Sequence, residues 1–142
     1  MSHHTVNIQN KSRTRLVFKG LSLMNAINSD ASSGGSAVLI QSGVGSFAGC
    51  LFVNNTAGGF GGAVWIYAGS DTHSFMNCSF IGNSAGTYGG AVYFSGSCRG
   101  CSHLNRTRFI GNHAGVSGGA VYFANPLGCP QAHARIGWRF EG

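Results

Sequence analysis

The chain has 142 residues, of which 43% are hydrophobic, and these values favour one packed domain over a disordered segment. Its 24 glycines are accompanied by only 2 prolines and follow no triplet period, which excludes a collagen-like chain. Only 8% of the residues are charged, and nine Lys and Arg against three Asp and Glu give a net charge of +6, so charge alone favours anionic partners.

Residues 1–24 are predicted to form an entry strand or a partial coil. Apolar and polar residues alternate around residues 6–8 and 16–18, which is typical of strands. His3 and His4 lie at the start of the chain, where a flexible terminus is a simpler interpretation than a metal site. We expect no export signal, because this segment has no apolar core of the signal-peptide type. Nowhere does the chain approach the ~18 apolar residues of a membrane-spanning helix.

Residues 25–123 are built from a sequence repeat. Its equivalent positions Cys50, Cys78 and Thr107 are 28 and then 29 residues apart. The three clear copies read CLFVNNTAGGFGGAVWI (50–66), CSFIGNSAGTYGGAVYF (78–94) and TRFIGNHAGVSGGAVYF (107–123), and a degenerate copy, NAINSDASSGGSAVLI, precedes them. The predicted organisation is an entry segment, four repeats and a tail, with the boundaries 1–24, 25–49, 50–77, 78–106, 107–123 and 124–142.

A repeat of this length predicts a solenoid. Helices are disfavoured, because each glycine in a helix costs roughly 1 kcal/mol and no 3.6-residue apolar stripe is present. Each unit is predicted to hold two or three short strands: CxFxx, AVYF or AVWI, and a variable strand between residues 95 and 106. We therefore predict an all-β fold, a right-handed, single-stranded parallel β-helix of about four coils, in which each strand pairs with its copy about 4.8 Å away.

Identical residues in such a stack form ladders that run along the axis. The predicted aromatic, amide and small-residue ladders are Phe52, Phe80 and Phe109; Asn55, Asn83 and Asn112; and Ala63, Ala91 and Ala120. The amide side chains would hydrogen-bond to one another along the stack. These residues are interpreted as structural rather than as ligand-binding.

Each clear repeat carries the motif FxxN followed by GGA[V/I], which stands here as FVNN…GGAV, FIGN…GGAV and FIGN…GGAV. This pattern resembles the repeat of the chlamydial polymorphic outer-membrane proteins. The resemblance implies a β-helix module of the pectin-lyase-like kind, carried as an autotransporter passenger. It implies an adhesin or interaction role at the cell surface, in the outer membrane or outside the cell, with a host or surface protein or a glycan as partner.

Cys50 and Cys78 share one repeat position, so we expect them to lie one above the other. Their Cα atoms would be about 4.8 Å apart, which can be bridged, but their parallel Cβ atoms would strain a disulfide. We therefore predict two buried free thiols. Thr107 takes the same position in the next repeat, which suits a small inward side chain.

Cys98 and Cys101 form a CxxC motif and are the weak candidates for a metal site. With Cys129, His103 or His113 they could complete a zinc site, but no second CxxC and no HxxxH pair supports it. No helix is predicted that would activate either thiol. Free thiols and a disulfide within the loop are the other interpretations, and no cofactor is predicted.

No catalytic residue is predicted. Polysaccharide hydrolysis needs two carboxylates and calcium-assisted lyases need several, whereas this chain has Asp30, Asp71 and Glu141 only. Asp71, His73 and Ser74 resemble a catalytic triad in composition, but neighbouring strand residues point to opposite faces. The stretch GGFGG lacks the context of a phosphate-binding loop. A β-helix that binds or processes carbohydrate remains the alternative function.

Exposed corners and open ends are the predicted contact surfaces. Phe60 and Tyr88 occupy equivalent corners, with Val116 expected at the next, and could contact a glycan or a protein, or simply form an apolar corner. Clusters of Lys and Arg towards both ends of the chain could serve solubility or bind anions, and no specific nucleic-acid partner is predicted. The prolines at 126 and 130 stop further strand growth, and the open sheet edges invite self-association.

Overall fold

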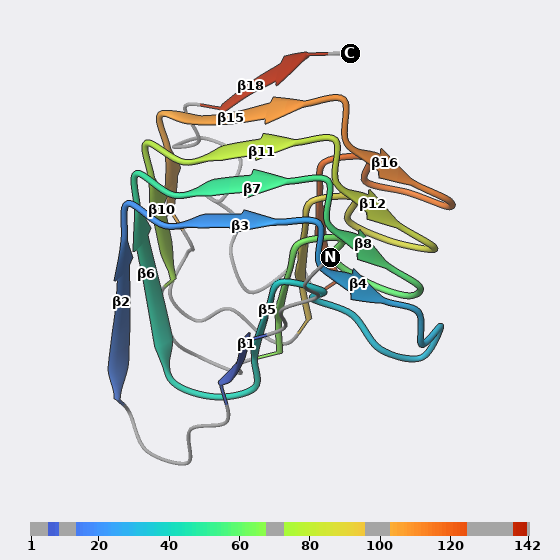
Figure 1. Ribbon diagram of the computed structural model, residues 1–142, viewed down its shortest axis with the longest axis horizontal. Coiled ribbons are helices and arrows are strands. Elements are labelled where there is room, and N and C mark those ends of the chain that lie inside the picture. The colour runs from blue at the N-terminus through green and yellow to red at the C-terminus, as the bar shows by residue number, and fades with distance from the viewer. Residues whose placement is uncertain (1–5, 9–13, 68–72, 96–102, 125–137, 142) are drawn as a thin grey trace.

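The structure, a computed structural model, describes residues 6–8, 14–67, 73–95, 103–124 and 138–141. In these residues all the regular secondary structure consists of β-strands, and the strands stack into a column of coils (Figure 1). None of the described segments forms a helix of the length and hydropathy needed to cross a membrane. The prediction of an all-β parallel β-helix of stacked coils is confirmed.

Four parallel sheets run along the column, and each takes one strand from every coil. Sheet A contains β1 (Val6–Ile8), β5 (Val38–Ile40), β9 (Val64–Ile66), β13 (Val92–Phe94) and β17 (Val121–Phe123). Sheet B contains β2 (Arg15–Lys19), β6 (Val44–Ala48), β10 (Ser74–Met76) and β14 (His103–Asn105). Sheet C contains β3 (Ser22–Met24), β7 (Leu51–Val53), β11 (Ser79–Ile81), β15 (Thr107–Ile110) and β18 (Trp138–Glu141). Sheet D contains β4 (Ile27–Asn28), β8 (Thr56–Ala57), β12 (Ser84–Ala85) and β16 (His113–Ala114).

The coil has four strands, so the prediction of two or three strands per unit is wrong. Strands β2–β5, β6–β9, β10–β13 and β14–β17 form coils 1 to 4, in the sheet order B, C, D, A. The strand missed in the sequence is the one in sheet D. It has only two residues, such as Thr56–Ala57, and the following glycines hide it.

Side chains in sheets B and C alternate between the inside and the outside of the column. In β7, Phe52 is fully buried, whereas its neighbours Leu51 and Val53 are half-buried on the outer face. The interior is apolar and aromatic, and a second phenylalanine column, Phe18, Phe47 and Phe75, packs from sheet B against the first. Burial of these rings is the main favourable contribution to folding, because one coil alone cannot cover its own apolar face.

Sharp corners between sheets B and C are made by single residues in the left-handed region. Gly49, Asn77 and Arg106 have φ values of 62°, 52° and 51° at this corner in coils 2 to 4. Glycine and asparagine tolerate this conformation, whereas an arginine adopts it at a cost. Arg106 is exposed, and the corner itself, rather than a contact of the side chain, dictates its backbone.

Each of the two glycines in GGAV is required for a different reason. The first glycine, Gly61 or Gly89, has a φ of 56° or 66° and turns the chain into sheet A. The second glycine allows neighbouring coils to approach closely, since a Cβ on Gly62 would collide with the carbonyl oxygen of Gly90. The two glycines of the repeated hexapeptide are therefore required by the backbone.

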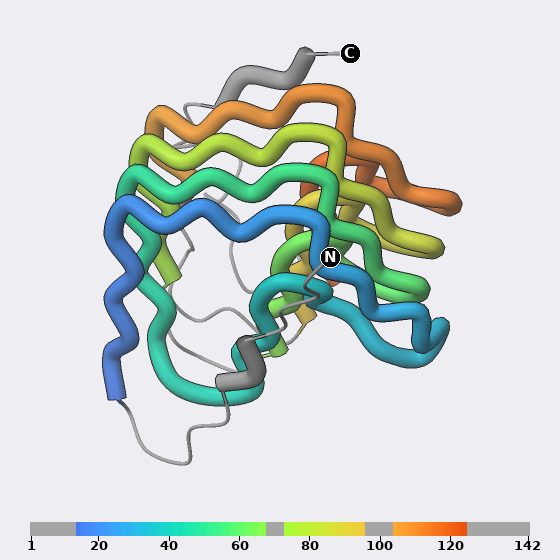
Figure 2. Tube along the Cα trace, viewed as in Figure 1, coloured from blue at the N-terminus to red at the C-terminus, as the bar shows by residue number. Residues whose placement is uncertain are grey.

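Between sheets D and A the chain runs outward, turns and returns, which gives the column a projecting arm (Figure 2). The returning limb carries Phe60 in coil 2 and Tyr88 in coil 3, which form isolated parallel bridges to each other. Because this limb meets the outer face of sheet A, rings on the two can touch.

The C-terminal segment adds one further strand to sheet C. β18 pairs with β15, so that Phe140 aligns with Phe109 and Trp138 with Thr107. The prolines at 126 and 130 lie outside the described residues.

Candidate functional site

The predicted phenylalanine ladder lies inside the column. Phe80 stacks on Phe52 with 4.5 Å between ring centroids and on Phe109 with 5.1 Å, and the rings are within 8° of parallel. All three side chains are at most 1% exposed. They are therefore inaccessible to a ligand and act in packing.

The asparagine ladder is a continuous hydrogen-bonded column. Asn83 Nδ2 donates to the carbonyl of Phe52 and to Oδ1 of Asn112, both at 3.0 Å. In turn, Asn83 Oδ1 accepts from the backbone N–H and from Nδ2 of Asn55, also at 3.0 Å. The amides thus satisfy the hydrogen bonds of backbone groups at the corner where sheet C meets sheet D. In coil 1 the equivalent residue is Ala26, whose backbone N–H donates to Oδ1 of Asn55.

The alanine ladder lies between the glycine pair and the sheet A strand of each coil. Ala63 and Ala91 are completely buried, and Ala120 in the last coil is half-buried. The Ala63 N–H donates to the Ala91 carbonyl at 2.9 Å, and the Ala91 N–H donates to the Ala120 carbonyl at 2.8 Å.

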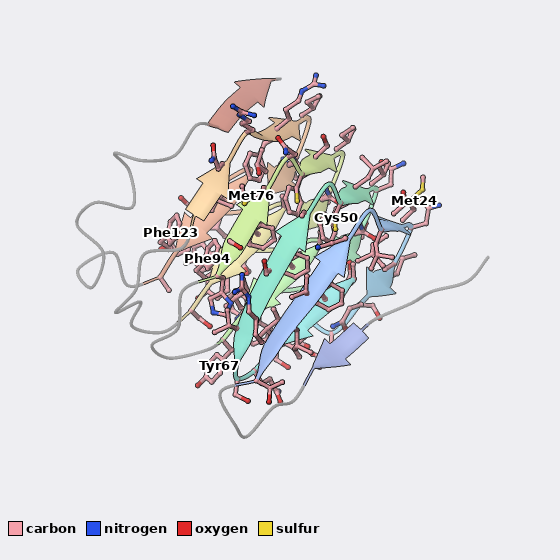
Figure 3. All side chains as sticks on the ribbon, turned by 90° about the vertical axis from the view of Figure 1, so that its left-hand side faces the viewer. Met24, Cys50, Tyr67, Met76, Phe94 and Phe123 are labelled. Carbon is pink, nitrogen blue, oxygen red and sulfur yellow. The ribbon has the colours of Figure 1, made fainter. Side chains whose placement is uncertain are left out.

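Cys50, Cys78 and Thr107 form a fourth ladder, at the start of sheet C. The two cysteines are free and buried. The Cys78 thiol donates to the Phe47 carbonyl of the preceding coil at 3.6 Å, and the Thr107 hydroxyl donates to the Phe75 carbonyl at 3.1 Å. Burial raises the pKa of Cys78 to about 11, so this thiol stays protonated and is a poor nucleophile. Figure 3 labels the buried Cys50, directly before β7, and the exposed Met24 and Met76, which end β3 and β10.

Cys98, Cys101 and Cys129 lie outside the described residues. His103 lies in β14 and His113 is exposed on sheet D, on different sides of the coil. Within the segments that the structure describes, no three His, Cys, Asp or Glu side chains lie close enough to hold a metal ion.

The acidic and triad residues are placed as follows. Asp30 is exposed, and hydrogen bonds from the Ser32 hydroxyl and backbone N–H lower its pKa. His73 is buried and its Nδ1 accepts the Gly45 N–H at 3.0 Å, while the Ser74 hydroxyl pairs with that of Ser46 on the outer side of sheet B. His73 and Ser74 thus face opposite sides of their strand, and Asp71 lies outside the described residues.

An outer aromatic surface extends over coils 2 to 4, and it is the site that we single out. Its members are Phe60, Trp65, Tyr88, Tyr93 and Tyr122. Trp65, Tyr93 and Tyr122 are register neighbours at the middle position of the sheet A strands, where the residues on either side face inward. Each of the five side chains is half-buried. The nearby Tyr67, which is 59% exposed, meets Trp65 edge to face.

The rings of this surface are stacked in a zigzag between the arm and sheet A. Phe60 stacks on Tyr93 of the next coil at 4.9 Å, and Tyr88 stacks on Tyr122 of the coil after it at 4.6 Å. Along the axis, Tyr93 and Tyr122 are 5.7 Å apart and nearly parallel, at 13°. Trp65 ends the row and donates its indole N–H to the Ser95 hydroxyl at 2.8 Å. The rings are therefore held in fixed positions before any partner arrives.

The electrostatics of the surface follow from the grouping of three phenols. Burial raises the pKa of Tyr93, and the charges that Tyr122 and Tyr88 would carry on ionisation raise it further. The phenol of Tyr93 is consequently protonated at neutral pH and is available as a hydrogen-bond donor.

The sequence identified only part of this surface. Phe60 and Tyr88 are equivalent as predicted, but Val116 is not the next member, because Tyr88 pairs with Ser117. Val116 precedes the residue that pairs with Tyr88, and it is 64% exposed. Sequence reasoning missed Trp65, Tyr93 and Tyr122. The signal was the alternation within VWI and VYF, which places the middle aromatic residue outside.

Comparison with family models matches the Chlamydia polymorphic membrane protein repeat at residues 49–67, 77–95 and 106–124. Each matched segment contains the sheet C, D and A strands of one coil. Comparison with curated proteins gave no significant match, and comparison with solved structures gave none either. The chain therefore carries three repeats of this type, in coils 2, 3 and 4, and the outer aromatic surface lies entirely on them.

Proposed function

We propose that the chain, as a carrier of three polymorphic membrane protein repeats, is a non-catalytic module of a cell-surface adhesin and binds its partner through the outer aromatic surface. The family name places such repeats in a membrane protein of Chlamydia, which supports a location at the outer membrane or outside the cell. The observation that carries the proposal is a row of four stacked, half-exposed aromatic rings, with Trp65 tilted against its end, on a rigid scaffold.

Rigid aromatic side chains are well suited to recognition. Tyrosine and tryptophan offer large contact areas, and they lose little side-chain freedom on binding. Here the neighbouring rings already restrain Tyr93 and Tyr122, so even less freedom is lost. The parallel ladder of sheet A fixes the spacing of these rings, because Val92 and Phe94 anchor the strand on the inside.

The charge distribution supports binding rather than polysaccharide chemistry. Coil 2 (residues 44–67) has no charged residue, and neither do residues 73–95 of coil 3. Cleavage of an acidic polysaccharide requires carboxylates or cationic groups beside the bound chain, and this surface provides neither. An uncharged aromatic surface instead favours contacts of the protein–protein type.

A cell-binding assay with the complete 142-residue chain tests the proposal. Fluorescently labelled protein is added to cultured mammalian cells, and binding is measured by flow cytometry. We expect saturable binding that the double substitution Tyr93→Ala and Tyr122→Ala reduces at least about tenfold. The matched control is Met76→Ala, which removes an apolar side chain that is 47% exposed on sheet B and should leave binding unchanged.

Two outcomes would contradict the proposal. Equal binding by the wild type and the double variant would show that the aromatic surface is not the adhesive site. Depolymerisation of a polysaccharide by the purified chain would show that the module is an enzyme. Circular dichroism of each variant checks that the β-helix is intact.

A further inference from the structure

We infer that the outer aromatic surface takes a proline-rich peptide segment in the polyproline II conformation, lying parallel to the axis of the column. This inference rests on the proposed function and names the chemical class of its partner. It is drawn from the orientation of the rings, their hydroxyl groups, their spacing and the charge around them.

The orientation of the rings argues against a sugar platform. Stacking on a sugar requires an exposed ring face, but the faces of Tyr93 and Tyr122 are turned towards each other and towards the arm. In a stacked row, the ring edges and their hydroxyl groups face outward. The edges carry partial positive charge and attract electron-rich groups such as carbonyl oxygens.

The polar groups of the surface suit a polyproline backbone. Tyr88, Tyr93 and Tyr122 contribute three phenol hydroxyls, whose rings contact one another. A polyproline II helix makes no internal hydrogen bonds, so its carbonyl oxygens are free to accept from these hydroxyls. Its pyrrolidine rings are apolar and can pack against the half-exposed edges of the aromatic row, as prolines pack against aromatic side chains in other domains that bind such peptides.

The spacing of the coils matches the peptide repeat. Equivalent side chains two coils apart, such as Trp65 and Tyr122, are separated along the axis by about 9.6 Å, from a strand spacing of ~4.8 Å. One turn of polyproline II has three residues and a length of about 9.3 Å. A segment that lies along the axis can therefore place a proline against coil 2 and the equivalent proline against coil 4.

The electrostatics favour a neutral segment. Residues 44–67 and 73–95, which carry four of the five rings, contain no Lys, Arg, Asp or Glu. An acidic or basic ligand meets no opposite charge on these residues and would lose hydration on binding. Binding should accordingly change little between about 50 and about 300 mM NaCl.

Fluorescence anisotropy with the complete chain tests the inference. The probe is a labelled nonapeptide of three Ala-Pro-Pro units, and the comparison peptide replaces every proline with glycine. We expect saturable binding of the proline peptide only, weakened about threefold to tenfold by Tyr93→Phe, which keeps the ring and removes the hydroxyl. The double variant Tyr93→Ala and Tyr122→Ala should weaken it further, and Met76→Ala should not.

Tyr93→Phe keeps the ring stack, so its effect does not depend on a change of fold. Equal binding of the two peptides, or no effect of Tyr93→Phe and the double variant, would overturn the inference. If the double variant loses cell binding while the proline peptide does not bind, the inference fails and the proposed function stands. If the same surface instead binds a neutral oligosaccharide, the partner is a glycan and the inference is wrong.

Discussion

Two aromatic columns run along this molecule, one inside and one outside, and they differ in ring geometry and in exposure. The inner rings, Phe52, Phe80 and Phe109, are within 8° of parallel and are buried. The outer rings are tilted by up to 27° in their closest stacked pairs and remain half-exposed. The same spacing between coils thus produces a buried core on one side of the backbone and a half-exposed aromatic surface on the other.

The comparison also explains why the middle coils are uncharged. Each side chain lies about one strand spacing, ~4.8 Å, from its equivalents in the next coils. A charge repeated in every coil would face like charges, as the register partners Arg108 and Arg139 do at the last strands, whereas repeated aromatic rings or amides attract one another. Among the described residues, the Lys and Arg side chains lie on the first coil and the last, namely Arg15, Lys19, Arg106 and Arg108, with Arg139 on β18.

The largest expected effect is the loss of an inner ring. Phe80→Ala should lower the free energy of unfolding by about 3–5 kcal/mol, because it removes a ring that is stacked on both sides and leaves a cavity. Urea denaturation followed by circular dichroism measures it. The matched control is Ile81→Ala, one residue along the strand and half-buried on the outer face, which should cost clearly less. An equal loss of unfolding free energy in both variants would contradict the assignment of Phe80 to the interior and Ile81 to the outer face of sheet C.

The amide column should come next. Asn83→Ala removes the acceptor of two hydrogen bonds from Asn55 and the donor to the Phe52 carbonyl. Leaving these buried groups unpaired should cost about 2–4 kcal/mol in the free energy of unfolding. The neighbouring substitution Ser84→Ala, on the outer side of sheet D, serves as control in the same denaturation experiment. If Asn83→Ala is as mild as Ser84→Ala, the column is not a source of stability.

These two effects concern features that the sequence could predict, and the reason is physical. The phenylalanine and asparagine ladders repeat letter for letter in coils 2 to 4, whereas the equivalent residues in coil 1 are Leu23 and Ala26. The missed sheet D strands have only two residues each and read IN, TA, SA and HA, which is too short for a repeated pattern to identify them as strands. They are held by backbone pairing, which many sequences can form. Predictions from repeated letters therefore found the core and the fold, but undercounted the strands.

The outer surface was only partly predictable for a related reason. At its positions coil 1 has Gly34 and Leu39, coil 2 has Phe60 and Trp65, and coil 4 has Ser117 at the corner where Val116 was expected. The backbone does not dictate these side chains, so their letters vary from coil to coil. Only the alternation of each strand indicates that they share a face.

A third prediction concerns the outer column. Tyr93→Ala should lower the free energy of unfolding by about 1–2 kcal/mol, because a half-exposed ring buries less area and leaves no closed cavity. The protein should remain folded at 25 °C while its binding to cells is impaired. Thermal denaturation and the cell-binding assay on the same preparation measure both. A loss of stability as large as that of Phe80→Ala would show that the outer rings belong to the core.

The smallest expected effect is a pH dependence from the inner thiol. Burial raises the pKa of Cys78 to about 11, from a usual value near 9. Between these values the unfolded chain releases the thiol proton and the folded chain keeps it, so the unfolded state is favoured as the pH rises. The free energy of unfolding should therefore fall between about pH 9 and pH 11. Cys78→Thr, which copies Thr107, should reduce this fall, and denaturation at about pH 8 and pH 10.5 compares the two proteins. If the variant loses as much stability as the wild type between the two pH values, ionisation of the Cys78 thiol is not the cause of the fall.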